Sequence, residues 1–159
     1  MSGPASTDLQ QKRFQDFVIY SDGLTSGDIY RDEKKFVNGN NSYFSLFTRV
    51  YEMYDKPPED KSRVLVGQIF CDYKTFYDNN NKIGAVMGNQ THFFKNGSIN
   101  VQFSTYNYYN AEIPVVATIV YGTGDYLGAQ GYMIINHKQI IIEGDVVKSD
   151  FKDTFKFTN

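Results

Sequence analysis

The stretch IGAVMGNQTHFFKNGSINVQF, residues 83–103, contains two segments of alternating character joined by the dipeptide Asn96-Gly97. After the dipeptide, Ile99, Val101 and Phe103 alternate with polar residues. Successive side chains of a strand point to opposite faces, so these three share one face. Asn-Gly between two alternating segments is a strong signal for a tight turn joining antiparallel strands. The stretch therefore predicts a β-hairpin.

The same period of two continues in both directions along the chain, with β-branched and aromatic residues in excess. We expect further strands over Phe17–Asp22, Tyr43–Tyr54, Val64–Tyr73, Ile113–Tyr121, Tyr132–Ile142 and Phe151–Phe157. This makes about eight strands and no helix. An antiparallel sheet of that size removes its unpaired edges by closing on itself. We therefore expect an all-β fold with a single small antiparallel β-barrel, in preference to a sandwich.

The length of 159 residues fits one domain. Residues 1–13 are mostly polar and show no apolar periodicity, so we expect a flexible leader there and the barrel domain over residues 14–159. Apolar residues make up 41% of the chain, and 13 Tyr and 13 Phe supply large side chains for a core. A disordered chain is excluded by this composition.

The charge balance argues against a nucleic-acid partner. The chain has 16 Lys and Arg against 18 Asp and Glu, a net charge of −2, and so lacks the basic surplus that phosphate binding requires. No apolar run approaches the roughly 18 residues of a membrane span, and the N-terminal residues do not resemble a secretory signal. We expect a soluble, cytoplasmic protein.

The single cysteine, Cys71, allows neither an internal disulfide nor a multi-cysteine metal site, and only His92 and His137 could add imidazole ligands. We therefore predict no metal. Cys71 is expected to be a small core residue rather than a nucleophile. His137, within Ile-Asn-His-Lys-Gln, is expected in an exposed polar turn, and the environment of His92 is left open.

The glycines of residues 122–128 follow the spacing G-x-G-x-x-x-G. A phosphate-binding loop would need a helix after the glycines to present its backbone amides, and none is predicted. The pattern instead favours a tight turn in which glycine permits close backbone approach.

Three polar residues share predicted strand faces with aromatic or small residues. Asp22 shares a face with Tyr20, while Arg49 shares one with Tyr43, Phe47 and Tyr51, and Gln90 shares one with Gly88 and His92. In a small barrel such a face either meets water or lines a mostly apolar cavity that carries a few polar groups. Alternation alone leaves both possibilities open for each strand.

The segment Glu112–Ala117, followed by the glycine-rich residues 122–132, resembles the signature of dirigent proteins and the glycine turn of allene oxide cyclases. Val18–Asp22 is similar to the opening strand of dirigent proteins. Residues 63–67, 83–88 and 97–102 resemble further strands of the same superfamily, in the same order. Gln130 stands where dirigent proteins usually have arginine, and Gln90 stands near a cysteine of the cyclases.

The resemblance implies an eight-stranded barrel, often trimeric, whose cavity steers the cyclisation or coupling of a hydrophobic unsaturated molecule without metal or organic cofactor. It places Asp22 where dirigent proteins carry an acidic residue. We expect Asp22 to transfer a proton, and Tyr20 and Arg49 to orient the substrate or stabilise negative charge. The expected ligand-binding residues are Tyr43, Phe47, Tyr51 and Gln90. The alternatives are a barrel that carries a lipid-like ligand without catalysis and a purely structural oligomer.

Overall fold

The computed structural model describes residues 12–26, 30–35, 41–77, 83–106, 112–143 and 146–159. This part of the chain contains strands and no helix, so it contains no helix that could cross a membrane. The strands are β1 (Phe17–Ser26), β2 (Tyr30–Lys35), β3 (Asn41–Tyr54), β4 (Leu65–Tyr77), β5 (Ile83–Phe94), β6 (Gly97–Thr105), β7 (Val115–Gly124), β8 (Gly131–Glu143) and β9 (Val146–Phe157).

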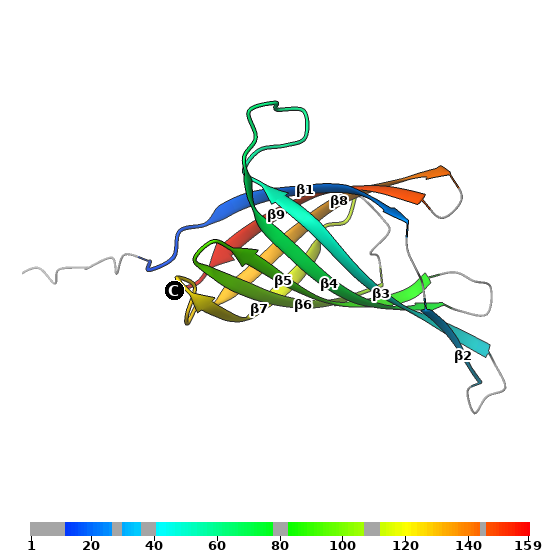
Figure 1. Ribbon diagram of the computed structural model, residues 1–159. Coiled ribbons are helices and arrows are strands. Elements are labelled where there is room, and N and C mark those ends of the chain that lie inside the picture. Colours follow the sequence, from blue (N-terminus) through cyan, green and yellow to red (C-terminus); the bar gives the residue numbers. More distant parts are fainter. Residues whose placement is uncertain (1–11, 27–29, 36–40, 78–82, 107–111, 144–145) are drawn as a thin grey trace, which may run out of the picture.

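The strands close into a barrel because β1 pairs on both sides (Figure 1). One side of β1 pairs with β9 along ten residues, and the other pairs with β3 through Tyr20↔Tyr54, Ser21↔Met53 and Asp22↔Glu52. The ring runs β1-β9-β8-β7-β6-β5-β4-β3 and back to β1, all antiparallel. These eight strands confirm the predicted antiparallel β-barrel.

Alternation along each strand separates the inside of the barrel from the outside. On β7, Val115, Ala117 and Ile119 are buried, whereas Val116 and Val120 are exposed. The same period of two runs along β4, β8 and β9 in the described residues. The inward rows form the core, and the interior of an eight-stranded barrel either is filled by such side chains or holds one small ligand beside them.

Aromatic rings close one end of the barrel. Phe17 stacks on Phe155 at 4.7 Å between ring centroids and meets Phe94 edge-on at 5.7 Å. Phe94 also contacts Tyr126, which comes from the turn between β7 and β8, at 5.1 Å. Phe14 covers the same end, with its ring 5.4 Å from that of Phe157. The inward-facing side chains that are not part of this aromatic cluster therefore lie toward the opposite end of the barrel.

The predicted turns are confirmed. β5 and β6 form a hairpin in which Phe94 pairs with Gly97 across Lys95 and Asn96. Gly124 and Gly128, in the glycine-rich turn before β8, have φ of +59° and +82°, a region that side-chain-bearing residues rarely adopt. The glycines therefore serve turn geometry, as the sequence analysis expected.

The strand β2 was not predicted. Its sequence, YRDEKK, has no apolar alternation, and it pairs only with β3, beyond the point where β1 leaves that strand. Apolar alternation is the signal from which strands are predicted, and this sequence lacks it. The predicted leader, residues 1–13, lies outside the described residues apart from Lys12 and Arg13.

Candidate functional site

The inner wall of the barrel carries polar side chains beyond the aromatic end. Gln90 and His92 point inward from β5, and Asp153 points inward from β9 between Phe151 and Phe155. All three polar side chains are at most 3% exposed. Further buried polar or thiol groups of the inner wall are Ser21, Cys71, Thr75 and His137. Apolar rings and a cluster of polar groups thus share one interior.

His92 and Asp153 meet across the barrel. Nε2 of His92 lies 3.5 Å from Oδ2 of Asp153. Four steps around the ring separate β5 from β9 in either direction, so the pair joins opposite walls. A carboxylate can only accept hydrogen bonds, so a neutral His92 that bonds to it carries its proton on Nε2 and has Nδ1 as an acceptor. Phe155 meets the imidazole edge-on at 5.1 Å, on the side of the aromatic end.

A row of paired residues crosses the inner wall beside this pair. Arg49 on β3 pairs in register with Cys71 on β4, which pairs with Gln90 on β5. Nε2 of Gln90 donates to the hydroxyl of Tyr73. Burial raises the pKa of the Cys71 thiol to about 12, against a smaller opposing effect of a hydrogen bond from Tyr73. The thiol is therefore protonated at neutral pH, which confirms Cys71 as a buried core residue and argues against a nucleophile.

Several buried polar atoms of this interior have no hydrogen-bond partner among the residues that the structure describes. They are Oγ of Ser21, Oγ1 of Thr75, Oε1 of Gln90, Nδ1 of His92 and Oδ1 of Asp153. Leaving such an atom unsatisfied costs about 1–3 kcal/mol. A core that served stability alone would replace these groups with apolar side chains, so this cluster is the candidate functional site.

Two of the predicted catalytic residues do not reach this interior. Tyr20 and Asp22 alternate along β1 with Ile19 and Ser21, which are buried, and so point to the outer face of the barrel. The structure therefore does not bring Tyr20 and Asp22 into one inner cavity with Arg49, and the catalytic roles of these residues stay predictions. Both faces of β1 carry large side chains, so its sequence pattern does not reveal which face is inward.

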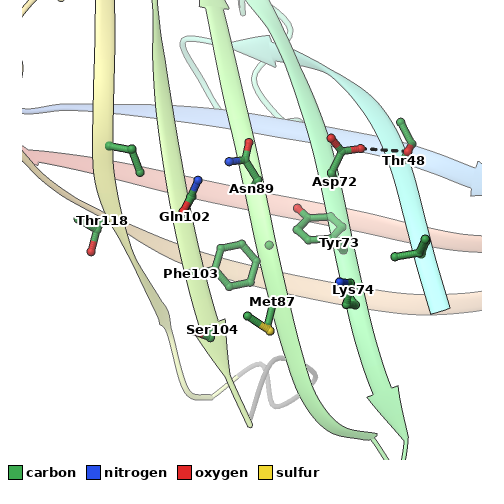
Figure 2. Close-up of a pocket in the computed structure, with 13 residues that line it drawn as sticks. Thr48, Asp72, Tyr73, Lys74, Met87, Asn89, Gln102, Phe103, Ser104 and Thr118 are labelled. Atoms are coloured by element: carbon green, nitrogen blue, oxygen red, sulfur yellow. Dashed lines mark hydrogen bonds between the residues drawn. The ribbon is translucent and has the colours of Figure 1, made fainter. Parts of the chain in front are cut away.

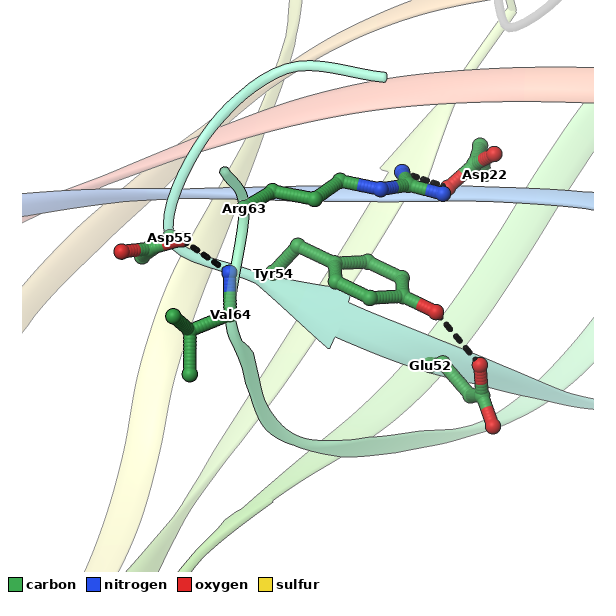
Figure 3. A network of polar contacts seen from close by, with 6 residues as sticks. All are labelled: Asp22, Glu52, Tyr54, Asp55, Arg63 and Val64. Atoms are coloured by element: carbon green, nitrogen blue, oxygen red, sulfur yellow. Dashed lines mark hydrogen bonds and ion pairs between the residues drawn. The ribbon is translucent and has the colours of Figure 1, made fainter. Parts of the chain in front are cut away.

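Asp22 instead belongs to an outer network at the β1–β3 seam, defined as the three residue pairs between these strands (Figure 3). Oδ1 of Asp22 accepts a hydrogen bond from Nη1 of Arg63 at 2.7 Å. The Arg63 guanidinium lies 3.9 Å from the centre of the Tyr54 ring, and the Tyr54 hydroxyl donates to Glu52 at 2.6 Å. The hydrogen bond to Glu52 raises the pKa of Tyr54, and the bond to Asp22 raises that of Arg63. Arg63 thus holds the loop between β3 and β4 next to the carboxylates of Asp22 and Glu52, two residues that pair across the seam.

Replacing Asp22 with asparagine is expected to change stability little. Partly exposed ion pairs contribute weakly, because solvent screens them and ordering both side chains has an entropic cost. We expect the thermal midpoint to fall by no more than a few degrees and any ligand binding inside the barrel to be unchanged. Thermal unfolding followed by circular dichroism measures the first effect. A loss of cooperative unfolding would contradict the placement of Asp22 on the outside.

The remaining predicted site residues lie on the inner side or outside the described side chains. Arg49 shares the inward phase of Tyr51 and Met53 on β3 and is partly exposed. Tyr51 is buried, with its ring 5.3 Å from that of Phe151, and Gln90 is buried as described above. Their roles in ligand binding stay predictions. The side chains of Tyr43 and Phe47 lie outside the described part, although both residues belong to β3.

The sequence pattern does not reveal the contribution of β9 to this interior, and it predicts the wrong place for one histidine. Asp153 alternates with Phe151, Phe155 and Phe157, a phase that marks it as an inward acid once the strand is recognised. His137 was predicted in an exposed turn, which is wrong. It lies within β8, is buried, and stacks on Phe151 at 6.2 Å. Its polar neighbours Asn136 and Lys138 are exposed, because they occupy the outward positions of the strand.

A groove of about 700 Å³ crosses the outside of the barrel over β3 to β7 (Figure 2). Its centre is a row of polar residues in register across neighbouring strands: Thr48, Asp72, Asn89, Gln102 and Thr118. Oγ1 of Thr48 donates to Oδ1 of Asp72 at 3.0 Å. These groups are at the surface, where water can satisfy them. They therefore point to a ligand less strongly than the unpartnered atoms of the interior.

A metal site receives no support from the described residues, which contain no group of three or more His, Cys, Asp and Glu side chains able to hold an ion. The predicted absence of a metal and of an organic cofactor is left as a prediction.

The chain is similar to several solved structures. A pterocarpan synthase dirigent protein is 15% identical with a TM-score of 0.47, covering 97% of this chain and 95% of its own. A pyocyanin demethylase is 12% identical with a TM-score of 0.44, covering 87% and 99%. An exo-specific intermolecular Diels-Alderase is 15% identical with a TM-score of 0.39, covering 89% and 100%. Similarity at this level concerns the fold, which the strand pairing establishes independently.

No protein-family model and no curated protein matches the sequence.

Proposed function

We propose that the protein binds a largely apolar, unsaturated small molecule inside the barrel and steers its cyclisation or coupling without a cofactor. The observation that carries the proposal is the cluster of buried polar atoms around His92, Asp153 and Gln90 that lack partners among the described residues. A mostly apolar wall with a few fixed polar groups is typical of small-molecule sites. Holding a flexible molecule near its reactive geometry removes much of a reaction barrier without a nucleophile.

Arg49 lies in the same row of the inner wall as Cys71 and Gln90, and it is partly exposed. In this proposal the ligand enters from the end of the barrel away from the aromatic cluster and reaches the His92–Asp153 pair.

In this proposal the proton-transfer role assigned to Asp22 passes to the His92–Asp153 pair. A carboxylate that accepts from one imidazole nitrogen orients the ring and makes the other nitrogen a better base. Arg49 keeps its proposed role of stabilising negative charge, since it pairs in register with Cys71 and its charge lowers the pKa of that thiol. Assembly as a homotrimer stays a prediction.

Binding can be tested with N-phenyl-1-naphthylamine, a neutral apolar dye whose fluorescence rises on leaving water. We expect saturable binding to one site of the wild-type protein. Ala117→Phe adds a ring to the inner wall and should weaken binding by about tenfold or more. Val116→Phe, one residue away on the outer face, should leave it unchanged.

Circular dichroism and thermal unfolding confirm that both variants are folded before binding is compared. Equal dye binding by the two variants would contradict a site inside the barrel. Binding without conversion of any candidate substrate would favour the alternative, a barrel that carries its ligand. No binding by the wild-type protein would favour the purely structural role.

A further inference from the structure

The buried atoms of Gln90, His92 and Asp153 that lack partners among the described residues are an amide oxygen, an imidazole nitrogen and a carboxyl oxygen. The two oxygens are hydrogen-bond acceptors, and so is this nitrogen when the imidazole is neutral with its proton on Nε2. We infer that the ligand presents a hydrogen-bond donor to this cluster, as a phenol or another hydroxyl-bearing unsaturated molecule does, and not a carboxylate. This inference rests on the proposed function and specifies the chemistry of its ligand. It follows from counting the donors and acceptors of each side chain.

Gln90 offers its oxygen because its nitrogen is already used. Nε2 donates to the Tyr73 hydroxyl, so the amide nitrogen of Gln90 faces Tyr73. Oε1 is then the free group of Gln90, and it is an acceptor.

Asp153 and His92 offer acceptors for the same reason. Oδ2 of Asp153 is engaged by Nε2 of His92, which leaves Oδ1 of the carboxylate and Nδ1 of the imidazole. The hydroxyls of Ser21 and Thr75 can donate or accept, so they match either kind of ligand. The described interior near Asp153 therefore holds a surplus of acceptors.

A carboxylate ligand fits this cluster poorly. A carboxylate can only accept hydrogen bonds, and the free oxygens of Gln90 and Asp153 offer it no donor. Arg49 is the group that could favour it, and its Nη1 donates to the Thr48 carbonyl at 3.3 Å. The experiment must therefore compare donor, neutral and anionic ligands of one shape.

Displacement of N-phenyl-1-naphthylamine by three naphthalenes makes this comparison. 2-Naphthol donates a hydrogen bond, 2-methoxynaphthalene has the same ring without a donor, and 2-naphthoate carries a carboxylate. We expect 2-naphthol to bind about tenfold more tightly than 2-methoxynaphthalene, because only the former satisfies a buried acceptor. We expect 2-naphthoate to be the weakest competitor.

Gln90→Met tests the cluster directly, because methionine has a similar shape and no amide oxygen. It should reduce the preference for 2-naphthol over 2-methoxynaphthalene about threefold or more. Gln102→Met is the matched control, since Gln102 is exposed on the outer face of β6 and should leave the preference unchanged.

Two results would overturn the inference while leaving the proposed function in place: displacement by 2-naphthoate at least as strong as by 2-naphthol, or equal binding of 2-naphthol and 2-methoxynaphthalene. The wild-type comparison decides this even if Gln90→Met does not fold. Failure of the wild-type protein to bind the dye or any naphthalene would instead overturn the proposed function, and the inference with it.

Discussion

Replacing Phe155 with alanine is expected to lower the free energy of unfolding by about 3–5 kcal/mol, the range for a large aromatic deleted from a packed core. Phe155 is fully buried and stacks on Phe17, with Phe157 6.4 Å away on β9 and the His92 imidazole edge-on to its ring. The deletion would remove the contact between the aromatic end and the polar cluster. Urea unfolding followed by circular dichroism measures the effect.

The control is Phe93→Ala. Phe93 points outward from β5, is 47% exposed, and contacts Phe70 on the same outer face at 5.2 Å. Its loss should cost less than about 1 kcal/mol, since little area leaves water there. Comparable losses for the two phenylalanines would mean that the inward and outward faces of the barrel are assigned wrongly.

Gly131→Ala is expected to lower the free energy of unfolding by about 3 kcal/mol. Gly131 begins β8 with φ of +143°, which a residue with a side chain rarely adopts. A Cβ added there would lie 2.0 Å from the carbonyl oxygen of Lys156, a backbone atom of the adjoining strand β9. Relieving that contact must shift the pairing of Gly131 with Phe157, at the aromatic end of the barrel.

Gly128→Ala separates backbone strain from steric conflict. Gly128 has φ of +82°, but the nearest atom to an added Cβ is Nη1 of Arg13 at 3.6 Å, an ordinary contact. It should cost about 1–2 kcal/mol, from the left-handed backbone alone. If Gly131→Ala were no more destabilising than Gly128→Ala in the same unfolding experiment, the tight approach of β8 to β9 would be contradicted.

Most of the barrel could be predicted because its strands alternate and its tightest turns carry glycine. The dipeptide Asn96-Gly97 predicts the β5–β6 hairpin. The alternation of Val115, Ala117 and Ile119 with their neighbours, which are exposed in the structure, predicts β7. Both features depend on residues that are close together in the chain, so they can be predicted from the sequence. β2 is not predicted because its sequence, YRDEKK, has no apolar alternation, and the strand is recognised only from its pairing with β3.

The face of each strand could not be predicted from alternation when both faces carry large residues. β1 has Phe17 and Ile19 on the inside and Val18 and Tyr20 on the outside, so its pattern is nearly symmetric. Closure of the barrel decides which face of β1 points inward. It places Ser21 inside the barrel and Asp22 outside, where Asp22 pairs with Arg63. Closure is a property of the whole ring and has no local signal.

The candidate site depends on closure in the same way. His92 and Asp153 are 61 residues apart in the chain and meet because β5 and β9 are opposite walls of the ring. The residue types were visible, but their proximity follows from strand order and register. An interior acid was expected on β1, and the structure places it on β9.

The position of a bound ligand relative to the two faces of β7 tests the proposed binding site inside the barrel most directly. Methyl groups of Ala117 and Ile119 point into the barrel, and those of Val116 and Val120 point out, with Val120 lining the outer groove. Nuclear Overhauser contacts can be measured between N-phenyl-1-naphthylamine and these methyl groups in the wild-type protein. If the ligand binds inside the barrel, we expect contacts to Ala117 and Ile119 and none to Val116 or Val120. Contacts to Val120 and the neighbouring Met87 instead would place the ligand in the outer groove and contradict it.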